Sequence, residues 1–75
     1  MKQLIEYIAK ALVDDVDQVD VHVREDRDHA YELHVAADDR GKVIGRKGRT
    51  AHAIRTVLAA ATRDEDARPT LDIVD

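Results

Sequence analysis

The sequence predicts a small α+β domain of two layers, in which three helices cover one face of a three-stranded sheet. Apolar residues recur with a helical period over residues 2–13 and 49–61, and they alternate with polar residues over 19–23, 31–35 and 70–74. The predicted order is therefore helix, strand, strand, short helix, glycine loop, helix, strand. A sheet with one apolar face needs helices to cover that face. We expect residues 1–75 to form a single domain.

The first predicted helix covers residues 2–13. Its aliphatic side chains fall on one stripe and its charged side chains on the other, as in an amphipathic helix. Glu6 and Lys10 are spaced i, i+4 in the favourable order. The acids from Asp14 onward oppose the helix dipole, so we expect the helix to end near Val13.

The two alternating segments that follow predict an antiparallel hairpin. Residues 25–29 between them are polar throughout and form its connection. In one plausible register, His22 and His34 lie opposite each other on the polar face. Two exposed imidazoles do not make a tetrahedral site without further ligands, so we predict no metal site.

The second half contains a short helix, a glycine loop, a long helix and a closing strand. Asp38 or Asp39 is placed to cap a helical turn over residues 40–44, which Gly45 ends. Pro69 can stand only at the start of the last strand or on a strand at the edge of the sheet. One face of the long helix carries Ala51, Ile54, Leu58 and Ala61.

Charge is distributed unevenly along the chain. The net charge is −4, yet residues 40–63 contain seven basic residues and no acid, which gives this segment +7 and the remainder −11. A surface cleared of acids in this way favours contact with phosphate. The basic residues of this segment are Arg40, Lys42, Arg46, Lys47, Arg49, Arg55 and Arg63.

The loop Gly45-Arg46-Lys47-Gly48 has the features of a phosphate clamp. Glycine lets the backbone turn sharply and approach a ligand closely, and the following helix begins with unpaired N–H groups. A Walker loop would need Gly-x-x-x-x-Gly-Lys-Ser/Thr, and a dinucleotide fingerprint would need Gly-x-Gly-x-x-Gly. Neither spacing is present.

This G-x-x-G, preceded by Val43 and Ile44 and set between two predicted helices, resembles the motif of the KH RNA-binding domain in its bacterial type II arrangement. The first helix, the hairpin and the closing strand also fall where that family has them. In size the chain resembles the stand-alone KhpA (YlqC-like) family. The resemblance implies a clamp on the backbone of about four nucleotides of single-stranded RNA, with low sequence specificity, as in an RNA chaperone or regulator.

Carried onto this sequence, the resemblance assigns the backbone approach to Gly45 and Gly48, the phosphate contacts to Arg46 and Lys47, and part of an apolar groove floor to Ile44. We add Lys42, Arg49 and Arg55 from their charge and helix positions. His52, in the first turn of the long helix, is equally a candidate contact and a solvated histidine. The acidic run 64–66 would repel phosphate if it borders the groove.

The family resemblance also implies a homodimer or a heteromer with a larger KhpB (Jag)-like KH-containing protein. An alternative is a KH-fold module that acts mainly through a partner protein, bound around Ile54 and Leu58. The chain has no serine or cysteine and no evident carboxylate pair, so we predict no enzymatic activity and no cofactor. The acid near the start and the lack of a long apolar run predict a cytoplasmic protein without membrane association.

Overall fold

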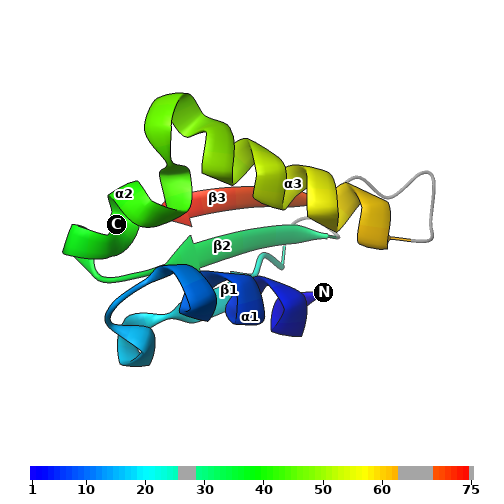
Figure 1. Ribbon diagram of the computed structural model, residues 1–75. Coiled ribbons are helices and arrows are strands. Elements are labelled where there is room, and N and C mark those ends of the chain that lie inside the picture. The colour runs from blue at the N-terminus through cyan, green and yellow to red at the C-terminus, as the bar shows by residue number, and fades with distance from the viewer. Residues whose placement is uncertain (26–28, 63–68, 75) are drawn as a thin grey trace.

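The computed structural model describes residues 1–25, 29–62 and 69–74. Its helices and strands follow the predicted order and confirm the predicted α+β class (Figure 1). They are α1 (Lys2–Leu12), β1 (Asp20–Val23), β2 (Ala30–His34), α2 (Arg40–Ile44), α3 (Arg49–Ala61) and β3 (Thr70–Val74). Within the described ranges, short 3₁₀ turns lie at Val16–Gln18, Ala37–Asp39 and Arg46–Gly48. The acidic run 64–66 and Arg63 lie outside the described residues.

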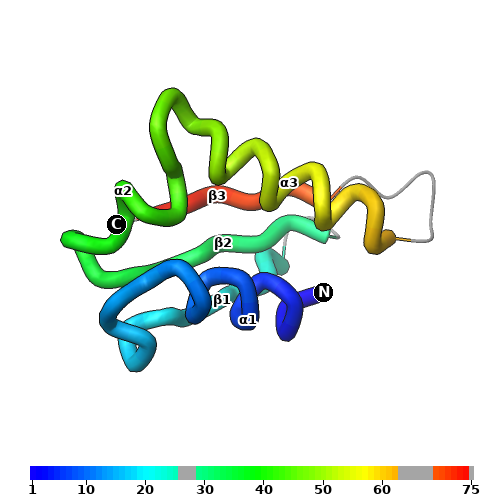
Figure 2. The backbone as a smooth tube through the Cα atoms, viewed as in Figure 1, coloured from blue at the N-terminus to red at the C-terminus, as the bar shows by residue number. Residues whose placement is uncertain are grey.

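The sheet has the strand order β1-β2-β3. Strand β1 runs antiparallel to β2, as the predicted hairpin requires, and β3 runs parallel to β2. A parallel pair needs a crossover connection, which here contains α2 and α3. Figure 2 shows α1 and α3 on the same side of the sheet, with α3 running along β3. The described helices thus form one layer and the sheet the other.

The register of the hairpin differs from the one expected for the two histidines. His22 pairs with Glu32, and His34 pairs with Asp20. The register is set by the buried face, where Val21 lies opposite Leu33, because a slip would move apolar side chains into water. The two imidazoles are diagonal neighbours instead, with ring centroids 5.0 Å apart and an edge-to-face arrangement.

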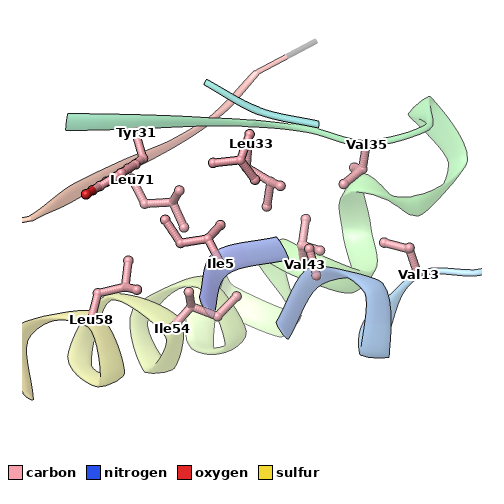
Figure 3. Packing of buried hydrophobic residues seen from close by; sticks show 11 residues of the cluster. Ile5, Val13, Tyr31, Leu33, Val35, Val43, Ile54, Leu58 and Leu71 are labelled. Carbon is pink, nitrogen blue, oxygen red and sulfur yellow. The ribbon is translucent and has the colours of Figure 1, made fainter. Parts of the chain in front are cut away.

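The core lies between the helix layer and the sheet. Figure 3 shows aliphatic side chains of the helices pointing at side chains from the strands. The six largest fully buried side chains come from α1, α2, α3 and all three strands; they are Ile5, Leu33, Leu58, Leu71, Val21 and Val43. Each element therefore contributes to one apolar cluster, whose burial is the main favourable term in folding.

The long helix α3 buries most of its predicted apolar face. Ala51, Ile54 and Leu58 are buried, whereas Ala61 at the last position is exposed. Ile54 and Leu58 are only 5% and 0% exposed. The alternative that places a partner protein on these two side chains is therefore wrong, because they already pack inside the domain.

Asp39 precedes α2 as expected, but its side chain does not cap the helix. The carboxylate is 3% exposed and instead accepts hydrogen bonds from the backbone N–H groups of Asp14 and Asp15, at 3.3 and 3.0 Å. The N–H of Asp15, then that of Asp14 and the ammonium of Lys42, lower the pKa of Asp39 in spite of its desolvation. Asp39 thus fastens the segment after α1 to the start of α2.

Candidate nucleic-acid interface

The loop between α2 and α3 adopts a backbone conformation that two glycines make possible. Gly45 has φ 76° and ψ 171°, and Gly48 has φ 74° and ψ 13°. Both angles lie in regions that L side chains adopt only at a cost in free energy. The N–H of Gly48 donates to the carbonyl of Gly45 at 3.1 Å, which closes the loop into a single tight turn.

The two glycines differ in what surrounds them. A Cβ on Gly45 would lie 2.8 Å from the backbone nitrogen of Thr50 and 2.6 Å from its Cβ, and would also overlap its Oγ1. A Cβ on Gly48 would meet no atom within 4 Å. Gly45 is therefore required by packing against the start of α3, whereas Gly48 is required only by its backbone angles.

Lys47, at the tip of the loop, is also left-handed, with φ 58° and ψ 24°. A left-handed conformation costs a residue with a Cβ about 1–2 kcal/mol. A right-handed residue followed by a left-handed one turns successive N–H groups toward a common centre, an arrangement that binds anions. Such a conformation in lysine is not visible in the sequence, which singles out only the glycines.

The first turn of α3 adds further donors to the same surface. Gly48 is its N-cap residue and has no side chain with which to bond the first N–H groups. The first turn carries no acid to offset the positive end of the helix dipole. The loop and this helix end therefore present backbone N–H groups and positive potential together.

Three of the predicted cations are available at this surface. Arg46, Lys47 and Arg49 are exposed, and within the described part of the chain none of them forms an ion pair or a side-chain hydrogen bond. Ile44, directly before the loop, is 39% exposed and offers an apolar surface beside these charges. His52 is exposed one turn further along α3.

Lys42 is placed differently from the other predicted contacts. Its ammonium forms an ion pair with Asp14 and a second one with Asp39, the latter at 3.4 Å. The hydrogen bond to Asp14, followed by that to Asp39, raises the pKa of Lys42 above its ordinary value. Lys42 thus joins the segment after α1 to α2 and is not directed at the loop.

Arg55 also makes a contact within the domain. Its Nε and Nη2 both donate to the backbone carbonyl of Leu71 in β3, at 3.2 and 2.9 Å. This pair of bonds fastens the middle of α3 to the strand that lies beside it. The sequence offers no sign of the contact, because the two residues are separated by 16 positions and the acceptor is a backbone atom.

In the described residues, no group of three or more His, Cys, Asp or Glu side chains is arranged to hold a metal ion. Likewise, no helix in those residues is long and apolar enough to cross a membrane. The exposed cations Arg46, Lys47 and Arg49 give the loop surface fixed positive charge, which suits a polyanion.

Comparison with known proteins agrees with this geometry. The fold and the glycine loop define a KH domain, and the family model described as KhpA/KhpB, KH domain, matches residues 2–73. The chain belongs to this family. A protein of Halalkalibacterium halodurans named RNA-binding protein KhpA is 50% identical over the full length of both chains.

Further relatives carry the same name. The protein of Clostridium acetobutylicum is 51% identical over 99% of this chain and 100% of its own length. That of Chlamydia trachomatis is 40% identical over 100% of this chain and 97% of its own. No solved structure matches the chain. The family predicted from the glycine motif is confirmed.

Proposed function

We propose that this protein binds single-stranded RNA at the loop Gly45–Gly48 and the first turn of α3. The observation that carries the proposal is the clustering of three exposed cations, Arg46, Lys47 and Arg49, at the loop and the start of α3, where none of them has an ion-pair partner among the described residues. Its relatives are named RNA-binding proteins. The proposed mode of binding is a clamp on the RNA backbone. Phosphate contacts of this kind position the strand but carry no sequence information by themselves.

The site supports low sequence specificity, as expected of an RNA chaperone or regulator. The chain contains no Phe or Trp, so stacking of bases on an aromatic platform contributes little. Affinity then depends mainly on phosphate neutralisation. The proposal assigns no enzymatic activity and no cofactor to the protein, and it places the protein in the cytoplasm, where RNA is found.

Partner proteins form a second part of the proposal. A domain with a core of this size has modest stability, and association with a second copy would add to it. The family includes proteins of the KhpB kind, so a heteromer with a larger KhpB (Jag)-like protein is the other arrangement we propose. The loop projects from the end of the helix layer (Figure 1), so an assembly that buries another face of the domain would leave the loop accessible.

The test is fluorescence anisotropy of a labelled single-stranded RNA at several salt concentrations. If about four phosphates are neutralised, the slope of log K against log salt is near −3, from about −0.7 per phosphate. The double variant Arg46→Asp, Lys47→Asp should lose binding while circular dichroism shows an unchanged fold. RNA affinity equal to that of the wild type in this variant would exclude the loop as the binding site.

A matched control separates the position of the charges from their number. The double variant Lys2→Asp, Lys10→Asp changes the net charge by the same amount at exposed positions of α1. By its interaction with the helix dipole, an acid at position 2 stabilises the start of α1, and an acid at position 10 destabilises its last turn. The two effects on stability therefore partly cancel. This control should keep most of its RNA affinity, and an equal loss in both double variants would indicate non-specific attraction only.

A further inference from the structure

Lys42, the cation of α2 nearest in sequence to the loop, is held by two carboxylates that differ in exposure. Its ammonium forms ion pairs with Asp14 and, at 3.4 Å, with Asp39. The side chain of Asp39 is 4% exposed, and its oxygens also accept two backbone N–H groups. The side chain of Asp14 is 85% exposed, and Lys42 is its partner in the described residues. Asp39 is thus built into the fold, whereas Asp14 is a surface partner of the lysine.

Lys42 lies one helical turn before the loop. It precedes Gly45 by three residues, and residues three apart are neighbours on a helix surface. Figure 1 shows α2, the loop and the segment after α1 at the same end of the sheet. A clamp that holds about four nucleotides extends beyond the loop itself. The side chain of Lys42 is 42% exposed and has a flexible stem, so its ammonium can leave Asp14 for an anion bound at the loop.

We propose that Asp14 limits RNA affinity by competing with phosphate for Lys42, so that RNA must displace this carboxylate to gain a fourth cation besides Arg46, Lys47 and Arg49. The proposal rests on the proposed function. A carboxylate and a phosphate accept from the same ammonium donors. An ion pair between exposed groups contributes little free energy, so a phosphate can replace Asp14. The exchange leaves Asp39 satisfied, because its two backbone donors remain.

The electrostatics of this cluster agree with such a competition. The hydrogen bond to Asp14 is the largest cause that raises the pKa of Lys42, followed among the acids by Asp39. With both carboxylates ionised, the two acids and one base carry a net charge of −1, which repels phosphate. Without the charge of Asp14 the cluster is neutral, and the lysine has one partner fewer.

The experiment measures binding of a labelled single-stranded RNA to the full chain at several salt concentrations, in wild type and in Asp14→Asn. Asparagine removes the charge but keeps the size of the side chain and the backbone N–H that Asp39 accepts. The affinity should rise about two- to fivefold, which corresponds to the upper range for one exposed ion pair. The slope of log K against log salt should become steeper by about 0.7, the value of one further phosphate.

Asp15→Asn is the matched control, because it removes the same charge one residue away. The side chain of Asp15 is exposed and forms no ion pair in the described part of the chain. This variant should have the salt slope of the wild type and nearly the same affinity, since salt screens an exposed charge that has no partner. An equal rise in both variants would indicate general relief of repulsion and would overturn the role of Asp14.

Lys42→Met tests whether the gain depends on the lysine. In this background, adding Asp14→Asn should raise the affinity no more than Asp15→Asn does in the wild type, with an unchanged slope. A full gain without Lys42 overturns the inference. Should Lys42→Met not fold, Asp14→Glu takes its place, because glutamate keeps an acid beside Lys42. It should bind RNA as the wild type does, and an affinity as high as that of Asp14→Asn overturns the inference.

Failure of the proposed function has a different signature. If neither the wild type nor Asp14→Asn binds RNA at any salt concentration, RNA binding itself is refuted and the competition falls with it. If the wild type binds with a slope near −3 and Asp14→Asn has the same affinity and slope, the clamp stands and only the role of Asp14 is overturned.

Discussion

Replacing each glycine of the loop by alanine should have unequal effects on stability. In Gly45→Ala, the new Cβ meets the backbone nitrogen of Thr50 at 2.8 Å, and a backbone atom moves only if α3 itself shifts. Overpacking of this kind costs about 1–3 kcal/mol. The backbone angles of Gly45 lie in a region restricted to glycine, which adds about 1–3 kcal/mol.

The combined cost for Gly45→Ala, about 2–6 kcal/mol, is comparable to the roughly 3–5 kcal/mol that a core of this size supplies. Gly48→Ala meets no neighbouring atom and takes a left-handed conformation, which costs about 1–2 kcal/mol. We therefore expect Gly45→Ala to be largely unfolded or close to its midpoint without denaturant. Gly48→Ala should fold with a modestly lower urea midpoint.

Urea denaturation followed by far-ultraviolet circular dichroism measures both variants. Adding Thr50→Ala to Gly45→Ala removes the overlap with Oγ1 but leaves the backbone nitrogen and Cβ of residue 50 in place, so it should restore little stability. Equal midpoints for Gly45→Ala and Gly48→Ala would refute the assignment of the tight contact to Gly45. Full rescue by Thr50→Ala would show that the side chain alone limits the site.

Three further predictions concern the core, the loop and the link to α1. Leu58→Ala removes a fully buried side chain and should cost about 2–5 kcal/mol, measured as a lower urea midpoint; a loss under about 1 kcal/mol would contradict its place in the core. Lys47→Gly relieves a left-handed residue, so it should keep or slightly raise stability while lowering RNA affinity, and a destabilised variant would argue against that conformation. The pKa of Asp39 is lowered in the folded state, so its contribution to stability is present above its ordinary value of 3.8 and is lost as the pH falls through the lower folded value. Thermal unfolding of wild type and Asp39→Asn should show a gap near neutral pH that closes in that acidic range, and a constant gap would contradict the role of the carboxylate.

The sequence predicted most of the fold because its elements are encoded by local periods. The helix over residues 49–61 and the strand over 70–74 have the predicted bounds, and the first helix ends one residue earlier than expected. The helical period of 3.6 residues and the strand period of 2 residues depend only on which side chains are buried. Residues close together in the sequence are enough to show that pattern. The predicted register that places the two histidines opposite each other was wrong. The register depends on which buried residues meet across the two strands, and periodicity within one strand does not show this.

The site was predicted in part. The glycine motif and the clustered cations could be recognised, since both are contiguous in the chain. The role of Lys42 could not, because its acidic partners come from the loop after α1 and the turn before α2. Charge alone indicates where a cation is, and its neighbours in space decide whether it can bind a phosphate.

The sequence by itself determined the order of elements, the α+β class and the loop with its acid-free surroundings. Only the tertiary structure decided that Arg46, Lys47 and Arg49 are unpaired in the described residues, whereas Lys42 and Arg55 are engaged within the domain. It also separated a glycine that packing requires from one that backbone angles require. The physical reason is that periodicity and motifs are properties of adjacent residues, while ion pairs, edge contacts and steric limits arise between segments that folding brings together.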